Sequence, residues 1–149
     1  MKYYMGIDPG KSGALAVIRE DRRIFEVVPF DREAYLAAAQ TYFNLDIICC
    51  LEHVAAMPGQ GVTSMFSFGE NFGWLQGVLE ARRIGYQLVR PQVWKKEFSL
   101  NSSKQLSSEA CRRIFPDAGN WLRRTPKSRK DDDGIAEALL MAEYARRHF

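Results

Sequence analysis

The sequence predicts an α/β fold in which a mixed sheet of five strands is flanked by helices. Runs rich in β-branched and apolar residues are bounded by Gly, Pro or polar turns, and longer segments repeat apolar residues at helical spacing. Three strands come first, then helix, strand, helix and strand, then helices. This order favours an antiparallel meander followed by parallel strands. The 149 residues, 46% hydrophobic and 26% charged, are expected to form one domain over residues 1–149.

Short turns separate the first three strands. Gly and Pro over residues 9–13 predict a tight turn, a polar turn follows at 20–23, and Pro29 bounds the third strand. Later, Asp31 is placed to cap a helix, and the apolar run 46–52 is typical of a strand buried on both faces. The expected strands are 3–8, 14–18, 24–28, 46–52 and 86–89, and the expected helices are 32–41, 63–83, 93–98, 103–115 and 132–148. Residues 120–130 are basic and aperiodic, which predicts a mobile loop.

Two stripes run along the helix expected over residues 63–83. The apolar stripe consists of Phe68, Phe72, Leu75 and Leu79, and the other consists of Gly69, Gly73 and Gly77. Because Gly costs about 0.8–1 kcal/mol relative to Ala inside a helix, three in register require a reason. Close approach of another backbone would supply one, from the parent sheet or from a second subunit. The alternative is that the preceding loop continues through Gly69 and the other glycines are tolerated.

Cysteine usage and hydropathy bear on the compartment. The three cysteines, with Cys49 and Cys50 adjacent, fit neither a disulfide framework nor a zinc site, so we expect buried, reduced thiols. No apolar run is long enough for a membrane span, and Asp8 interrupts any signal-peptide core. We therefore expect a cytoplasmic protein, or a phage-encoded one acting in the host cytoplasm.

The net charge of +3 is unevenly distributed along the chain. Residues 90–130 hold eleven Lys or Arg against three Asp or Glu, a net of +8, which leaves −5 for the remainder. This asymmetry predicts a polyanionic partner for the basic third, although a solvated basic surface is the simpler alternative.

Four carboxylates form two candidate pairs. Asp8 and Glu52 end the first and fourth strands, so they meet at one sheet edge if those strands are parallel neighbours. Asp133 and Glu137 lie four residues apart on one face of the last helix. Unpaired buried carboxylates are costly, so the two pairs predict a bound divalent cation, Mg²⁺ or Mn²⁺. Taken singly, Asp8 could serve the turn, and the acids at 131–133 could cap the helix.

The motifs resemble those of RuvC-type Holliday junction resolvases, in the ribonuclease H-like superfamily. The resemblance covers nearly the whole chain and rests on Gly6-Ile7-Asp8-Pro9-Gly10, on Leu51-Glu52, and on the helix from Asp132 through Leu140. Trp94-Lys95 after Pro91 is more similar to the branch found in phages and organelles. The resemblance implies a ribonuclease H-like fold and a crossover junction endodeoxyribonuclease, active in DNA recombination and repair.

The resemblance also implies a catalytic site with two Mg²⁺ ions, which Mn²⁺ could replace. The implied catalytic and metal-binding residues are Asp8, Glu52, Asp133 and Glu137, with Asp132 as a further candidate. One lysine could offset charge at the scissile phosphate, and the choice among Lys95, Lys96 and Lys104 stays open. The candidate DNA-binding residues are Lys95, Lys96, Lys104, Arg123, Arg124, Lys127, Arg129 and Lys130.

Paired nicks in a nearly two-fold symmetric four-way junction predict a homodimer, with the helix that carries Gly69, Gly73 and Gly77 as its candidate interface. Phe66 and Phe68 could wedge into the junction, although for Phe68 packing in the core is the favoured alternative. Two other functions stay open: a nuclease acting on RNA–DNA hybrid or structured RNA, and a branched-DNA-binding protein without catalysis.

Overall fold

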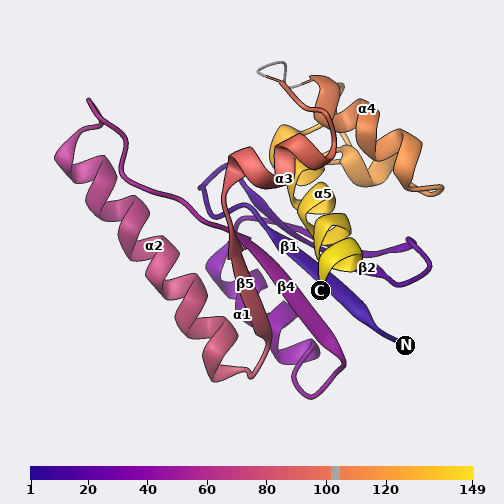
Figure 1. Cartoon of the computed structure of the whole chain (residues 1–149), viewed down its shortest axis with the longest axis horizontal. Coiled ribbons are helices and arrows are strands. Elements are labelled where there is room, and N and C mark those ends of the chain that lie inside the picture. Colours follow the sequence, from indigo (N-terminus) through magenta and orange to yellow (C-terminus); the bar gives the residue numbers. More distant parts are fainter. Residues whose placement is uncertain (102–104) are drawn as a thin grey trace.

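The computed structural model describes residues 1–101 and 105–149, and a five-stranded mixed sheet lies at its centre (Figure 1). The strand order is β3-β2-β1-β4-β5, and β1 pairs antiparallel with β2 but parallel with β4. This is the predicted meander followed by parallel strands. The strands are β1 (Tyr3–Ile7), β2 (Ala14–Arg19), β3 (Ile24–Pro29), β4 (Ile47–Glu52) and β5 (Gly85–Val89).

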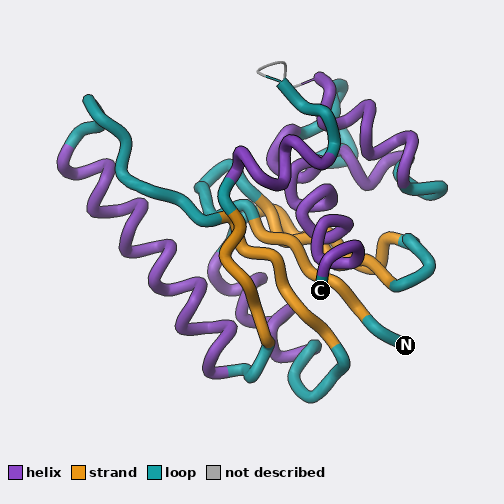
Figure 2. Tube along the Cα trace, viewed as in Figure 1, coloured by secondary structure: helices purple, strands orange, loops and turns teal. Residues whose placement is uncertain are grey.

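Helices cover both faces of the sheet (Figure 2). On one face α1 (Arg32–Thr41) and α2 (Val62–Ala81) enclose a core with Met5, Leu15 and Val17. The opposite face carries α3 (Pro91–Glu97), α4 (Gln105–Ile114) and α5 (Asp133–His148). Neighbouring strand residues alternate between the two cores, as the two-residue period of a strand requires. None of the helices in the described ranges is long and apolar enough to cross a membrane.

Helix α5 lies directly on the sheet. Its expected buried residues Ile135, Ala138, Leu139 and Ala142 are all at most 1% exposed. A Cβ on Gly6 of β1 would overlap the carbonyl oxygen of Ala138, and one on Gly134 would overlap that of Ser12. These two glycines therefore let the helix backbone approach β1 and the turn after it.

The structure of α2 decides between the explanations offered for its three glycines. Gly69, Gly73 and Gly77 all lie within the helix, so the preceding loop does not continue through Gly69. A Cβ on any of the three would meet nothing within 4 Å, so the sheet does not approach them. On the opposite side Leu75 and Leu79 are buried, as predicted, while Phe68 and Phe72 are half-buried. The glycine stripe faces outward.

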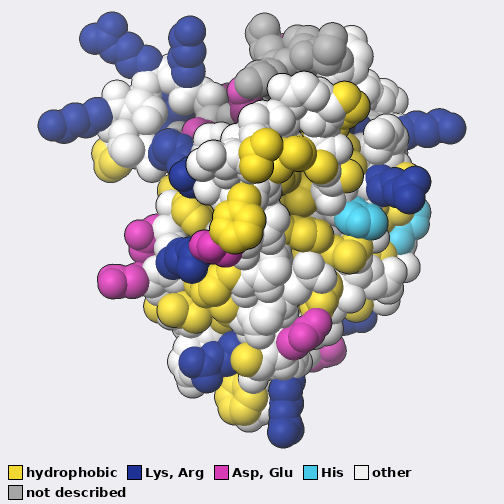
Figure 3. Space-filling model, turned by 90° about the vertical axis from the view of Figure 1, so that its left-hand side faces the viewer, with side chains coloured by type: hydrophobic (Ala, Val, Ile, Leu, Met, Phe, Trp, Pro, Cys, Tyr) yellow, Lys and Arg dark blue, Asp and Glu magenta, His cyan; other side chains and the backbone are white. Residues whose placement is uncertain are grey.

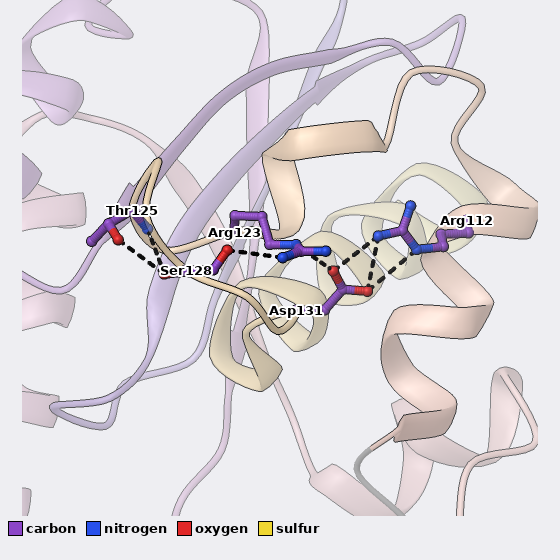
Figure 4. A network of polar contacts seen from close by, with 5 residues as sticks. All are labelled: Arg112, Arg123, Thr125, Ser128 and Asp131. Atoms are coloured by element: carbon purple, nitrogen blue, oxygen red, sulfur yellow. Dashed lines mark hydrogen bonds and ion pairs between the residues drawn. The ribbon is translucent and has the colours of Figure 1, made fainter.

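The basic segment is more ordered than its composition predicted. A short 3-10 helix, η1 (Gly119–Leu122), buries Leu122 completely. Asp131 accepts hydrogen bonds from Arg112 (2.9 Å) and Arg123 (3.1 Å), and Arg123 also donates to the carbonyl of Ser128 (Figure 4). The expectation of a loop without regular structure is therefore wrong at residues 120–122. The ion pairs and buried Leu122 join the segment to α4 and to the residues just before α5.

The cysteines follow the prediction. Cys49, Cys50 and Cys111 are free and buried, and burial raises the pKa of each thiol. They therefore serve as small core residues.

Candidate active site

Two strand-end carboxylates meet at one edge of the sheet. Ile7 of β1 lies opposite Leu51 of β4 in the parallel register, so Asp8 and Glu52 are the next residues on neighbouring strands. Asp8 also stabilises the turn that follows β1, as the sequence suggested, because its Oδ1 accepts a hydrogen bond from the N–H of Gly10 at 3.3 Å. The turn holds Asp8 at the edge where Glu52 ends β4.

Helix α5 adds a third carboxylate. Glu137 shares a hydrogen bond with Asp8 and, together with Asp8 and Asp133, lines a hollow of about 360 Å³. Ser12 and Gly134 line it too, so the close packing at Gly134 brings the first turn of α5 over the turn after β1. Asp8, Glu52 and Glu137 are here named the carboxylate cluster.

The cluster is electrostatically costly. Burial raises the pKa of Asp8, and burial together with the charge of Asp8 raises the pKa of Glu52. Burial and the charges of Asp8 and Glu52 raise the pKa of Glu137 to about 7. Such shifts arise where partly desolvated like charges face one another, and they are typical of functional sites.

Lys95 of α3 supplies a positive charge to the cluster. Its Nζ lies 3.7 Å from Oε1 of Glu137, and its charge lowers the pKa of all three carboxyls. Lys96, the next residue, is exposed, and Lys104 lies outside the described residues. Of the three candidate lysines, Lys95 is the one that the structure brings to the carboxylates.

Sequence reasoning missed a contact beneath Glu52. The indole N–H of Trp94 donates to Oε2 of Glu52 at 2.9 Å, and Trp94 is completely buried. The helical period of α3 marked Trp94 only as an apolar residue. Its position next to Lys95 was the available signal that it approaches the site.

The run of acids at 131–133 separates into different roles. Asp131 is held by Arg112 and Arg123, away from the hollow (Figure 4). Asp132 caps α5 through the N–H of Ile135. Although burial opposes its ionisation, the hydrogen bond from Arg124 lowers the pKa of Asp132. Asp132, Asp133 and Glu137 all line the hollow, and Asp132 is in addition paired with Arg124.

The donor set suits a hard divalent cation. The cluster offers only carboxylate oxygens, the ligands that Mg²⁺ and Mn²⁺ prefer. Burial and the neighbouring carboxylates keep the pKa of Glu137 raised although Lys95 lowers it. Across residues 1–101 and 105–149, no three His, Cys, Asp or Glu side chains already stand as a metal centre. The residues therefore fit a metal ion by chemistry, and they would adjust to hold it.

Apart from Lys95 and Lys104, the candidate DNA-binding residues divide into two groups. Arg123 is engaged by Asp131, and Arg124 donates to Asp132 and to the carbonyl of Ser12 at 2.7 Å. Both arginines therefore stabilise the fold through these hydrogen bonds. The exposed candidates are Lys96, Lys127, Arg129 and Lys130. Of the two candidate wedge residues, Phe66 is 73% exposed.

Comparison with solved structures gives matches that cover nearly the whole chain. RuvC of Thermus thermophilus, in complex with a Holliday junction substrate, matches with a TM-score of 0.63 and 17% identity, over 99% of this chain and 97% of that one. A second Thermus thermophilus RuvC structure gives 0.60 and 17%, over 97% and 96%. The yeast mitochondrial Holliday junction resolvase Ydc2 gives 0.48 and 16%, over 96% and 77%. No family model and no curated protein matches the sequence. The fold is thus that of RuvC, as the motifs implied.

Proposed function

We propose that this protein is a metal-dependent endonuclease that resolves four-way DNA junctions by phosphodiester hydrolysis. The observation that carries the proposal is the carboxylate cluster with Lys95, at the carboxyl ends of two parallel strands of a RuvC fold. The junction bound by the Thermus protein supports the choice of substrate.

The proposed chemistry distributes tasks among the residues of the site. Asp8, Glu52, Asp133 and Glu137 would hold two Mg²⁺ ions, with Mn²⁺ able to substitute. Bound there, such ions lower the pKa of an attacking water and stabilise the leaving 3′ oxygen. Lys95 would offset charge on the scissile phosphate, since its Nζ already faces the carboxylates. The hydrogen bond between Asp8 and Glu137 holds a proton that the site must release before both can bind a cation.

The exposed basic residues would bind the arms of the junction. Lys96 extends from α3, and Lys127, Arg129 and Lys130 lie on the loop before α5. Contacts to phosphate position DNA without reading its sequence, which suits a substrate recognised by shape.

A homodimer would supply the second active site for paired nicks. The outward stripe of α2 combines the three glycines with exposed Val62 (81%) and Phe66 (73%). Figure 3 views the molecule from the side on which α2 lies, and hydrophobic side chains run across the middle of this face. We therefore place the proposed dimer contact on this stripe of α2.

The test is cleavage of a synthetic mobile four-way junction with Mg²⁺. We expect paired nicks by the wild type, loss of cleavage with junction binding retained in Asp8→Asn, and unchanged cleavage in the matched control Asp21→Asn. Asp21 lies on the turn after β2 and pairs with Arg19. Faster cutting of an RNA–DNA hybrid than of the junction would instead identify a ribonuclease. Junction binding without any metal-dependent cleavage would identify a binding protein.

A further inference from the structure

Glu52 has one fixed oxygen and one available oxygen. The indole of Trp94 holds Oε2, and in the described part of the chain no other hydrogen bond reaches this carboxylate. A carboxylate with a free torsion loses conformational entropy when it binds a cation. The indole removes that cost in advance because it fixes the orientation of the group.

The position of Trp94 follows from the fold. Val89 of β5 lies opposite Glu52, and Pro91 starts α3 two residues later, so Trp94 falls within the first turns of α3. Its ring belongs to the core that also contains Cys50, two residues before Glu52 on β4. The indole is thus fixed by packing on the face toward which Glu52 points.

Helix α3 is itself secured to α5 at its far end. Glu97 accepts from Arg147 at 3.1 Å and lies 3.3 Å from Nε2 of His148. Near its centre Lys95 reaches Glu137. Through the adjacent residues Trp94 and Lys95, helix α3 therefore contacts both Glu52 of β4 and Glu137 of α5.

We propose that Trp94 is a positioning residue that orients Glu52 for metal binding, an inference that rests on the proposed function. Phe at this position keeps an aromatic ring in the core but cannot donate. Side chains that orient metal ligands typically contribute 10- to 100-fold to metal affinity.

The first test measures Mg²⁺ binding without DNA, as the midpoint of a calorimetric titration of the metal-free protein with Mg²⁺. Trp94→Phe should raise this midpoint about tenfold, and the control Trp121→Phe, at a 38% exposed site, should leave it unchanged. In a Glu52→Gln background, Trp94→Phe should have little further effect. An unchanged midpoint in Trp94→Phe, or a full tenfold effect that persists in Glu52→Gln, overturns the proposal.

The second test does not depend on the fold of a Trp94 variant. The chain has three tryptophans and so three indole N–H resonances. One of them should shift in Glu52→Gln and on addition of Mg²⁺, while those of Trp74 and Trp121 stay in place. Three unmoved resonances contradict the role of Trp94. If the wild type binds Mg²⁺ but cuts no junction, the proposed function fails and the Mg²⁺ midpoints still decide this inference.

Discussion

Two carboxylates of α5 affect the stability of the folded protein in opposite ways. Glu143 of α5 is completely buried but bonded to Arg146 and Arg147, which lower its pKa in spite of burial. Glu137, two turns earlier, faces Asp8 and Glu52, and its pKa is raised. The same residue type on the same helix is therefore stabilising at one position and costly at the other.

We predict that Glu137→Gln stabilises the metal-free protein at alkaline pH. A carboxyl with a raised pKa takes up a proton on folding, so its contribution is fully present below pH 4.5 and is lost as the pH rises through about 7. In EDTA at pH 8 the variant should gain about 2 kcal/mol of unfolding free energy, and at pH 4.5 almost none. Denaturant unfolding at the two pH values measures the difference.

The control has the opposite sign. Glu143→Gln should destabilise at pH 8, because the lowered pKa of Glu143 contributes stability above its unfolded value that is lost as the pH falls. Equal effects of Glu137→Gln at both pH values would show that Asp8 and Glu52 do not raise the pKa of Glu137.

Among the elements, α5 most directly sets the geometry of the site. It carries Asp133 and Glu137 and packs on β1 at Gly6, where a Cβ would meet backbone atoms. Backbone cannot move aside as a flexible side chain can. The height of α5 above the sheet is therefore fixed by the absence of a side chain at one position.

We predict that Gly6→Ala lowers the unfolding free energy by about 2 to 3 kcal/mol, the cost of overpacking a close contact. Gly85→Ala, where a Cβ would meet nothing within 4 Å, should be neutral or slightly stabilising. Denaturant unfolding compares the two variants. A small effect of Gly6→Ala would mean that α5 can lift from β1, and the carboxylate cluster would then not be rigidly spaced.

The elements were predictable where local chemistry alone specifies them. Alternation and turn residues located the strands, and strand ends located Asp8 and Glu52. The hydrogen bond from Trp94 to Glu52 and the contact of Arg124 with Ser12 join residues 42 and 112 positions apart, so no periodicity reveals them. Nor does composition distinguish Arg123, which closes a loop, from exposed Lys127.

At the scale of the whole molecule, the basic third is not a uniform surface. Three arginines of residues 90–130 form ion pairs within the fold: Arg112 and Arg123 pair with Asp131, and Arg124 pairs with Asp132. They count toward the net charge of this segment, but the two aspartates neutralise most of their charge. The positive charge left for the proposed DNA partner lies on exposed residues of the loop before α5, of α3 and of α4.

We predict that Lys127→Ala and Lys130→Ala weaken junction binding while leaving stability unchanged. Each lost phosphate contact should reduce the slope of log affinity against log salt by about 0.9. Arg123→Ala should instead lower the melting temperature, since it removes a partner of Asp131 and of the Ser128 carbonyl. Salt titrations of junction binding separate the two groups, and an unchanged slope in both lysine variants would exclude them from the interface.

The outward face of α2 predicts that the protein forms a dimer. A Cβ on Gly69, Gly73 or Gly77 would meet nothing within 4 Å among the described residues, and Val62 and Phe66 beside them are exposed. Such glycines cost helix stability unless a second helix packs on them. We expect twice the chain mass by light scattering, and monomers in Gly73→Arg. Glu109→Arg, on α4 across the sheet, adds the same side chain and should remain dimeric. If the contact provides the second active site, Gly73→Arg should nick single strands of a junction without pairing the cuts. A wild type that is monomeric at micromolar concentration, alone and on the junction, would remove α2 as the interface.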